Sequence, residues 1–408
     1  MKRQRAVPDL NQIIPYFQAI FSADNHCVIG YEVLGRWQTP QGMQSLGAFF
    51  HDPDIPDRLK MEADFHLHTA AFETFLTATA QDDVSVFINM NANHLMLDEA
   101  GFIQRLIRFQ NRGLDLSRVV VEITEHDFKG DFGFLSHLLK YLKSLGVKIA
   151  IDDLGKGASN LDRIAILEPD ILKVDIHSLK NDEPTHFYHG VIYSLALLSR
   201  KIGAELLFEG IENKLQFHYS WRKNGRYFQG YFFAKPAPEL IPKDILKNQF
   251  RQDIHHFIQL EQSSVKQLFE FSSRLNERLQ SVTGEVKISA DLDEWLWKIS
   301  PRVNDICFRM YITDYEGFQI TSNIVKEKGE WCFQKEMKGK NWSWRPYFIE
   351  NVIRMNLENR GILSDFYSDI ATGELIRTFS FPLGESRFLF IDIPNSVIRN
   401  IDVNDILF

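Results

Sequence analysis

Residues 148–153, KIAIDD, show the pattern that decides the fold, a short apolar run that ends in carboxylates. The same pattern recurs before and after this stretch. Runs rich in Val, Ile, Leu, Phe or Tyr end in Glu32, Asn89, Glu122, Lys173, Glu209 and Gln229. Such runs predict buried strands. A parallel barrel brings the ends of its strands to one rim, where enzymes of this architecture carry their active sites.

The alternation of strand and helix patterns predicts a TIM-like (β/α)8 barrel of the α/β class. Strands are expected at Tyr16–Phe21, Val28–Arg36, Val86–Met90, Val119–Thr124, Lys148–Asp152, Ile171–Val174, Glu205–Glu209 and Tyr227–Tyr231. Helices are expected at Asp57–Leu76, Gly101–Arg112, Asp131–Leu145 and Tyr188–Ile202, where apolar residues recur at helical spacing. Only the turn SADNHC separates the first two strands, so the first strand is expected to be antiparallel to the second.

The pattern changes after the barrel. Apolar residues from Ile245 to Leu279 follow helical spacing, which predicts one or two long helices that join two domains. This segment either contributes to a dimer contact or packs on its own barrel. Beyond it, short strands with Asp/Gly turns around a helix predict an α+β domain with an antiparallel sheet. The expected division is residues 1–242, 243–284 and 285–408.

Composition excludes several classes of protein. The formal net charge is −8, which argues against binding nucleic acid through a basic surface. The three cysteines form no CxxC pair, which argues against a structural zinc site and a secreted disulfide framework. The chain has no run of the ~20 apolar residues that a bilayer span requires. We therefore expect a cytoplasmic protein without a membrane span.

The acids predict a metal site, because so many carboxylates on one rim would repel each other strongly without cations. Oxygen ligands from Glu32, Asn89, Glu122 and Asp152 suit a magnesium-type ion. The adjacent Asp152 and Asp153 allow one carboxylate to bridge two ions, the usual arrangement for attack on a phosphodiester. Any single acid could instead cap the helix that follows its strand; the complete set favours a site.

Seven motifs resemble those of EAL-domain cyclic di-GMP phosphodiesterases, in the family's order from about Ile14 to Pro238. They are EVLGR, NMN, VEITE, IDDLGKG, ILKVD, FEGIE and FQGYFFAKP. The resemblance implies metal-dependent hydrolysis of one 3′–5′ phosphodiester in cyclic di-GMP, which gives linear pGpG. It also implies two ions, Mg²⁺ or Mn²⁺, with Ca²⁺ as a candidate inhibitor, and a homodimer.

The resemblance also implies roles for individual residues. One ion would be held by Glu32, Asn89, Glu122 and Asp152, and the second by Asp152, Asp153 and Glu209. Lys173 and Glu209 would act on the nucleophilic water, with Gln229 close to the ions. Arg36 would contact a substrate phosphate, and Leu34 and Gln18 would line the ligand groove. Glu125 and Glu212 would support the loop after Asp153, near the dimer interface.

Departures from the family pattern leave a second interpretation open. Val33 replaces the signature alanine and Phe208 the first residue of the usual AEG. The loop usually reads DDFGTGYSSL; here Lys156, Ala158 and Asn160 replace threonine, tyrosine and serine. No expected ligand is lost, but weaker packing of the loop would lower turnover while leaving binding intact. The alternative is therefore a cyclic di-GMP receptor with weak or no hydrolysis.

The C-terminal region resembles PAS-like or Cache-like sensory domains, on the stretches NWSWRPYF and SDFYSDIATGELIRTFSFPL. A pocket of that type would use Trp344, Arg345, Tyr347, Asp365 and Tyr367 to hold an unidentified small ligand. The competing interpretation is that the aromatic residues form the core and Arg345 pairs with Asp365. His66, His68, His255 and His256 lack the spacing of a zinc site and are expected on solvated helix faces.

Overall fold

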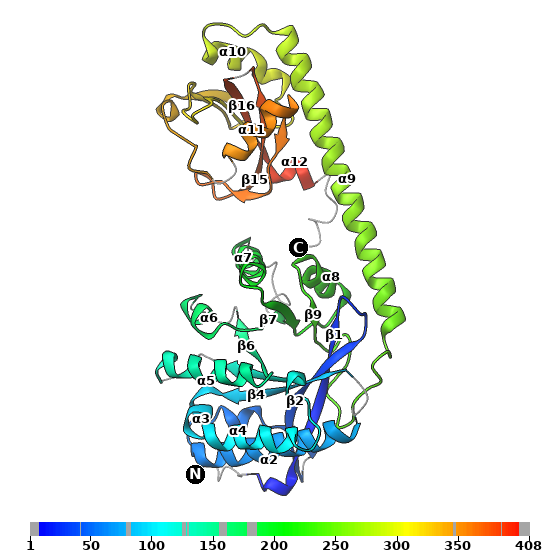
Figure 1. Cartoon of the computed structure of the whole chain (residues 1–408). Coiled ribbons are helices and arrows are strands. Elements are labelled where there is room, and N and C mark those ends of the chain that lie inside the picture. Colours follow the sequence, from blue (N-terminus) through cyan, green and yellow to red (C-terminus); the bar gives the residue numbers. More distant parts are fainter. Residues whose placement is uncertain are drawn as a thin grey trace, which may run out of the picture. The chain divides into compact units, whose positions relative to one another are not determined.

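The N-terminal part of the chain is a closed barrel of eight strands (Figure 1). The computed structural model describes residues 8–40, 42–78, 83–124, 128, 130–154, 161–177, 186–345, 348–384 and 386–399. The barrel strands are β1 (Ile13–Ser22), β2 (Val28–Thr39), β4 (Ser85–Asn91), β5 (Val119–Thr124), β6 (Lys148–Leu154), β7 (Ile171–Asp175), β8 (Glu205–Glu209) and β9 (Tyr227–Phe228). These strands agree with the predicted positions, except that β9 ends before Gln229.

Pairing between β1 and β2 closes the barrel. β1 is antiparallel to both of its neighbours, β2 and β9, and the remaining barrel strands are parallel. The predicted antiparallel start is therefore confirmed, and its cause is the short connection between β1 and β2, which leaves no room for a crossover. The sequence did not predict β3 (Gly42–Ser45), which pairs with β2 outside the barrel.

Helices connect the parallel strands and cover the outside of the barrel. They are α1 (Gly47–Phe50), α2 (Asp57–Ala78), α3 (Ala92–Leu97), α4 (Glu99–Gln110), α5 (Phe132–Ser144), α6 (Leu161–Leu167), α7 (His186–Ile202) and α8 (Lys214–Arg222). Their buried faces follow the apolar spacing from which four of them were predicted; in α5, Leu135, Leu138, Leu139 and Leu142 are buried. None of the described helices is long and apolar enough to cross a membrane.

A single helix, α9 (Lys247–Glu285), follows the barrel. The chain divides into two compact units within this helix, between His255 and His256. Near its start, Phe250 packs against Phe21, Phe217 and Phe233 of the barrel unit. Near its end, Leu275 and Leu279 lie in the core of the second unit, so the two ends of one helix belong to different cores.

The second unit is an antiparallel sheet with helices on both faces, as the predicted α+β class requires. Its strands pair in the order β12 (Glu330–Gln334), β11 (Asn323–Glu327), β10 (Arg309–Asp314), β16 (Arg387–Pro394), β15 (Leu375–Pro382) and β13 (Ile362–Leu363), and β14 (Tyr367–Ser368) also pairs with β15. The sequence pattern also predicts strands at Phe318–Ile324 and Ser364–Asp369; in the structure β11 begins only at Asn323, and only Tyr367–Ser368 of the second range forms a strand. The helices are α10 (Leu292–Ile299), α11 (Phe348–Glu358) and α12 (Asn395–Arg399).

Alternation along the strands of this sheet produces two cores. Met310 and Ile312 of β10 face the core that contains α10 and the end of α9. Tyr311, between them, faces the core that contains Phe348 and Met355 of α11. Since side chains of consecutive strand residues point to opposite faces, one strand serves both cores.

Candidate functional site

Inside the barrel, a layer of polar side chains lies next to a layer of apolar side chains, two residues closer to the rim along each strand. The apolar layer contains one buried side chain from each of six strands: Ile20, Phe87, Val120, Ala150, Ile171 and Leu207. Two residues further toward the rim on the same strands are Gln18, Asn89, Glu122, Asp152, Lys173 and Glu209. Residues two apart on a strand share a face, so the predicted site residues enter the barrel from their own strands.

β2 supplies Glu32 to the same layer, and Gly30 lies below it. A Cβ at Gly30 would come within 2.6 Å of the Phe87 ring. Glycine is therefore required at this position so that Phe87 can fill the apolar layer.

Lys173 is the centre of the polar layer. Its fully buried Nζ lies 2.9 Å from a carboxylate oxygen of Glu122 and 3.3 Å from one of Asp152. Its distances to carboxylate oxygens of Glu209 and Glu32 are 3.3 Å and 3.7 Å. The structure therefore brings together four carboxylates that the sequence placed on four separate strands.

Amide side chains hold Glu32 from two sides. Asn89 Nδ2 donates to Glu32 Oε1 at 2.9 Å, and Gln229 Nε2 donates to Glu32 Oε2 at 2.6 Å. Gln229 Nε2 also lies 3.1 Å from Gln18 Oε1, and Gln18 Nε2 donates to the carbonyl of Ala234 at 3.2 Å. These bonds fix the carboxylate of Glu32 and leave the oxygen of the Asn89 amide available as a ligand.

The electrostatics of the cluster are unbalanced. Burial raises the pKa of Glu122 well above its usual value, and the neighbouring Glu32 raises it further. Burial also raises the pKa of Glu209, to about 8, against the opposing effect of Lys173. Burial disfavours the charge on Lys173, but Asp152, Glu122 and the other acids outweigh it and raise the lysine pKa well above its usual value. One cation is too little for four carboxylates.

The residues present fit divalent cations. Apart from the close approach of Lys173, neither oxygen of Glu122 has a hydrogen-bond donor among the described residues. In the described part of the chain, no three Asp, Glu, His or Cys side chains are arranged to hold an ion; the carboxylates close on Lys173 instead. All the side-chain atoms that could bind an ion here are oxygens, the ligands that Mg²⁺, Mn²⁺ and Ca²⁺ prefer. The side chain of Asp153 lies outside the described residues, as do Glu125, Lys156, Ala158 and Asn160.

A cavity of about 340 Å³ opens above the cluster. Seven of the predicted site residues line this cavity: Gln18, Glu32, Leu34, Asp152, Glu209, Glu212 and Gln229. Five further lining residues among those described were missed by the sequence interpretation: Asp175, His177 and Tyr231, and the glycines Gly210 and Gly230. The sequence could have indicated Asp175 and His177, because they follow Lys173 at intervals of two residues and therefore continue the same face of the strand.

Arg36 lies on the same face of β2 as Glu32 and Leu34, but it is not among the residues that line the cavity. Its guanidinium lies 5.5 Å from the centroid of the Tyr16 ring, and its Nη1 donates to the carbonyl of Gly35 at 3.1 Å. The arginine is partly exposed, so the predicted phosphate contact requires a ligand that extends along this face.

One sequence interpretation was wrong. His68 is only 1% exposed, not on a solvated helix face, because α2 packs that side of its surface against β4. Its Nε2 lies 3.0 Å from the backbone carbonyl of Asn89, and burial lowers the pKa of the imidazole. His68 therefore supports the strand end that carries a predicted metal ligand.

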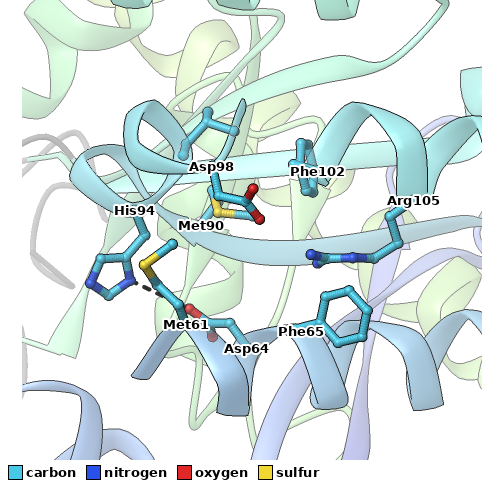
Figure 2. A pocket seen from close by; sticks show the side chains of 9 residues that line it. Met61, Asp64, Phe65, Met90, His94, Asp98, Phe102 and Arg105 are labelled. Atoms are coloured by element: carbon cyan, nitrogen blue, oxygen red, sulfur yellow. Dashed lines mark ion pairs between the residues drawn. The ribbon is translucent and has the colours of Figure 1, made fainter. Parts of the chain in front are cut away.

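A second, smaller cavity of about 30 Å³ lies among α2, α3 and α4, beside the end of β4 (Figure 2). Arg105 is 8% exposed and lies with its Cζ 4.0 Å from the centroid of the Phe65 ring. Its Nε has no hydrogen-bond partner among the described residues. On the opposite side, His94 Nδ1 lies 3.8 Å from Asp64 Oδ2, the contact dashed in Figure 2. This volume is enough for a few ordered waters.

In the second unit, the residues predicted for a sensory pocket are only partly gathered. The guanidinium of Arg345 lies 5.7 Å from the Tyr367 ring centroid and 5.9 Å from that of Trp344. Trp344 is 66% exposed and Asp365 is also exposed, while Tyr347 lies outside the described residues. The Tyr367 hydroxyl is 2.5 Å from the Thr378 hydroxyl. Trp344 is thus a surface residue and does not belong to the core.

Two protein families together match almost the whole chain. Residues 2–236 match the EAL domain, and residues 240–404 match the EAL-domain associated signalling protein domain. An uncharacterized EAL-domain containing protein of Bacillus subtilis, YkuI, is 45% identical over 398 residues, which is 97% of each chain. A probable cyclic di-GMP phosphodiesterase of Escherichia coli, PdeG, is 28% identical over 237 residues, or 55% of this chain and 45% of its own.

The crystal structure of B. subtilis YkuI, in complex with substrate c-di-GMP and calcium, is similar over both units. The TM-score is 0.89 at 44% sequence identity, and the match covers 95% of this chain and 97% of that one. Because this likeness spans both family matches, it supports the order of barrel, helix and sheet domain described above.

Proposed function

The chain belongs to the EAL-domain family, and we propose that its barrel hydrolyses one 3′–5′ phosphodiester of cyclic di-GMP to linear pGpG, using two divalent ions. The observation that carries this proposal is the convergence of Glu32, Glu122, Asp152 and Glu209 on Lys173. The adjacent Asp152 and Asp153 also favour the enzyme, because a receptor that only binds the nucleotide has no chemical need for both aspartates. The relative whose structure contains substrate c-di-GMP and calcium supports the choice of nucleotide and the involvement of divalent ions.

Glu32, Asn89, Glu122 and Asp152 would hold one ion, and Asp152, Asp153 and Glu209 the second. When bound, a pair of Mg²⁺ or Mn²⁺ ions lowers the pKa of water and offsets charge on the phosphate oxygens. Ca²⁺ binds similar oxygen ligands in looser geometry, which makes it a candidate inhibitor. Gln229 keeps Glu32 in place through its 2.6 Å hydrogen bond.

The residues of the chain supply the proton chemistry. Hydrolysis adds the oxygen of water to phosphorus, breaks the bond to the ribose 3′-oxygen and delivers a proton to that oxygen. Glu209 would accept the proton of the attacking water only in its ionised form; burial raises its pKa to about 8, so bound ions would be needed to keep it ionised at neutral pH. Lys173 keeps its charge and faces the negative charge that develops on the phosphate. Arg36, Leu34 and Gln18 would hold the rest of the nucleotide.

A second candidate function, a receptor without efficient turnover, is favoured by the changed loop. Lys156, Ala158 and Asn160 depart from the family pattern in the loop that follows Asp153, which Glu125 and Glu212 would support. If this loop holds the second ion poorly, the nucleotide is bound and hydrolysed slowly.

The experiment that separates the two functions is incubation of the purified chain with cyclic di-GMP and Mg²⁺ or Mn²⁺. Nucleotides are followed by chromatography beside a binding titration. Appearance of pGpG supports the phosphodiesterase. Tight binding without pGpG supports the receptor, and neither binding nor product contradicts both.

We further propose that the second unit is regulatory and that the protein forms a homodimer. Arg345 and Tyr367 would contribute to a pocket for a small ligand, with Trp344, Tyr347 and Asp365 around it. A ligand there would control the barrel only if it binds one of two states more tightly. Sedimentation of the purified chain tests the dimer, and a monomer at micromolar concentration would contradict it.

A further inference from the structure

His177 lines the catalytic cavity without a role in the chemistry proposed above. Asp175 is the last residue of β7, and His177 lies two residues beyond it, further along the path that leads out from Lys173. Its side chain is 52% exposed, whereas that of Lys173 is fully buried. The imidazole therefore belongs to the mouth of the cavity, above the cluster at its floor.

Asp175 fixes the orientation of this imidazole. Its Oδ1 is 2.6 Å from His177 Nδ1 and 2.7 Å from the His177 backbone nitrogen. A carboxylate only accepts hydrogen bonds, so Nδ1 carries the hydrogen. In the neutral ring Nε2 is then an acceptor. Nε2 lies 3.8 Å from a carboxylate oxygen of Glu212, which is too far for a hydrogen bond.

Gly210 provides the space for this arrangement. Its φ is +73°, and a Cβ at this position would lie 2.1 Å from His177 Nδ1 and 2.9 Å from Asp175 Oδ1. Any larger residue directly after Glu209 would displace the imidazole. The position of His177 is thus set both by a hydrogen-bond partner and by the shape of the neighbouring loop.

The mouth of the cavity is rich in acceptors. Asp175, Glu212 and His177 line it, and a phosphate would be repelled by the two carboxylates. The matching ligand surface is one that offers N–H donors. The Watson–Crick edge of guanine offers two adjacent donors, N1–H and the 2-amino group, whereas that edge of adenine carries an acceptor at N1. Tyr231, 57% exposed at the same cavity, supplies an aromatic face for a base.

We propose that His177 is a specificity-determining residue that accepts a hydrogen bond from the guanine edge of the cyclic dinucleotide through Nε2. This inference rests on the proposed function, since it assumes that cyclic di-GMP occupies the cavity. It assigns base selection to the mouth and phosphodiester chemistry to the floor. A site built to accept a hydrogen bond discriminates against an analogue that lacks the donor, because its acceptor is then left unpaired.

The test compares His177→Ala with the full-length wild type. Cyclic di-GMP and cyclic di-AMP each compete against a fluorescent cyclic di-GMP analogue in the presence of Ca²⁺, and chromatography checks that the nucleotides stay intact. The preference of the wild type for cyclic di-GMP is expected to fall about tenfold in His177→Ala. In His177→Gln, whose amide oxygen can still accept, the fall should be smaller. His137→Ala, an exposed histidine of α5, is the matched control and should keep the preference.

Each other outcome contradicts the inference. An equal loss of affinity for both nucleotides would mean that His177 contacts phosphate or ribose. An unchanged preference in both His177 variants would mean that it contacts no base. If the wild type fails to bind cyclic di-GMP, the proposed function fails first. If the wild type binds cyclic di-GMP but the His177 variants keep its preference over cyclic di-AMP, only this inference fails.

Discussion

Each unit of the molecule buries a cluster of charges, and the two clusters are built differently. In the barrel, the rim cluster consists of Glu32, Glu122, Asp152 and Glu209 around Lys173. In the second unit, the Arg309 cluster consists of Arg309, Asp369 and Asp392 with the hydroxyl of Thr378. The side chains of both clusters are mostly buried, so the main differences lie in charge balance and in hydrogen bonding.

The Arg309 cluster satisfies its own charges. Arg309 reaches both oxygens of Asp369, at 2.7 and 3.2 Å, and its Nε donates to Asp392 at 2.6 Å. Thr378 donates to the other oxygen of Asp392 at 2.5 Å. Burial alone would raise the pKa of Asp369, but the hydrogen bonds and charge of Arg309, together with the hydrogen bonds from Thr372, outweigh it and the pKa lies below its usual value. Such a cluster is complete without a ligand.

The rim cluster lacks this balance, and its carboxylates respond in the opposite direction. The pKa values of Glu122 and Glu209 are raised, because burial and neighbouring acids disfavour their charged forms. The comparison teaches that burial of acids is not itself a sign of function. The sign is a set of carboxylates whose charge the described side chains offset only in part, through Lys173, beside a cavity that admits a ligand.

The largest effect is expected from loss of a ligand in the rim cluster. Glu32→Ala should reduce hydrolysis of cyclic di-GMP at least ~100-fold, because even substitutions one shell away from a metal cost about 10–100-fold. Metal-dependent nucleotide binding should also weaken. Initial rates of pGpG formation measure the effect, with Glu62→Ala, an exposed acid of α2, as control. Hydrolysis that survives Glu32→Ala would refute the site assignment.

In the Arg309 cluster the corresponding loss should affect stability instead. Arg309→Met leaves two buried carboxylates without a partner and should destabilise the second unit by about 3–5 kcal/mol. Chemical denaturation followed by tryptophan fluorescence measures it. Arg354→Met, which removes only the exposed ion pair with Glu358, should change stability by less than about 0.5 kcal/mol. Equal effects of the two substitutions would show that the Arg309 cluster is not a structural element.

The same chemical change should have opposite signs in the two clusters. Glu122→Gln removes a carboxyl whose charged form burial and the neighbouring acids disfavour, and it should stabilise the metal-free barrel by on the order of 1 kcal/mol. Asp369→Asn removes a charge that Arg309 uses, and it should destabilise the second unit by about 1–3 kcal/mol. Thermal unfolding in chelator resolves the sign. Destabilisation by Glu122→Gln would show that the rim cluster is balanced without an ion.

The smallest effect concerns pH and His94, which lies outside both clusters. The carboxylate of Asp64, 3.8 Å from Nδ1, raises the pKa of His94 against the effect of burial, and Asp57 adds to the shift. The folded protein therefore holds the proton more tightly than the unfolded chain. The contribution is complete below the unfolded value of 6.5 and is lost as pH rises through the folded pKa. We expect at most about 1 kcal/mol, because Asp57 is exposed and screened.

A series of unfolding curves between pH 5.5 and 8.5 measures this contribution. His94→Gln should flatten the dependence over that range. An unchanged slope in the variant would assign the dependence to other groups.

The sequence was sufficient to predict the barrel because its strands repeat one signal, a short apolar run that ends in a polar residue. Glu122, Asp152 and Lys173 could be placed on one rim from that signal alone. The helices were predictable where one face is apolar, as in α5. The second unit was harder, because strands as short as β13 and β14 carry too few residues for a periodicity to show.

Contacts between elements that are distant in sequence could not be predicted. The burial of His68 depends on how α2 packs on β4, and its partner is a backbone carbonyl, which has no sequence signal. His177 depends on Asp175 beside it and on the absence of a side chain at Gly210 in another loop. The Arg309 cluster joins residues from three strands and a turn, so its pairing appears only in the fold.

The most direct test of the contrast between the clusters is a calorimetric titration of Mn²⁺ into chelator-treated protein at pH 7, in two buffers of different ionisation enthalpy. Because the pKa values of Glu122 and Glu209 are raised, ions that bind at the rim cluster should displace protons. The account predicts Mn²⁺ binding with proton release that Glu122→Gln reduces and Asp369→Asn leaves unchanged. Binding without proton release, or a loss of release in Asp369→Asn, would contradict it.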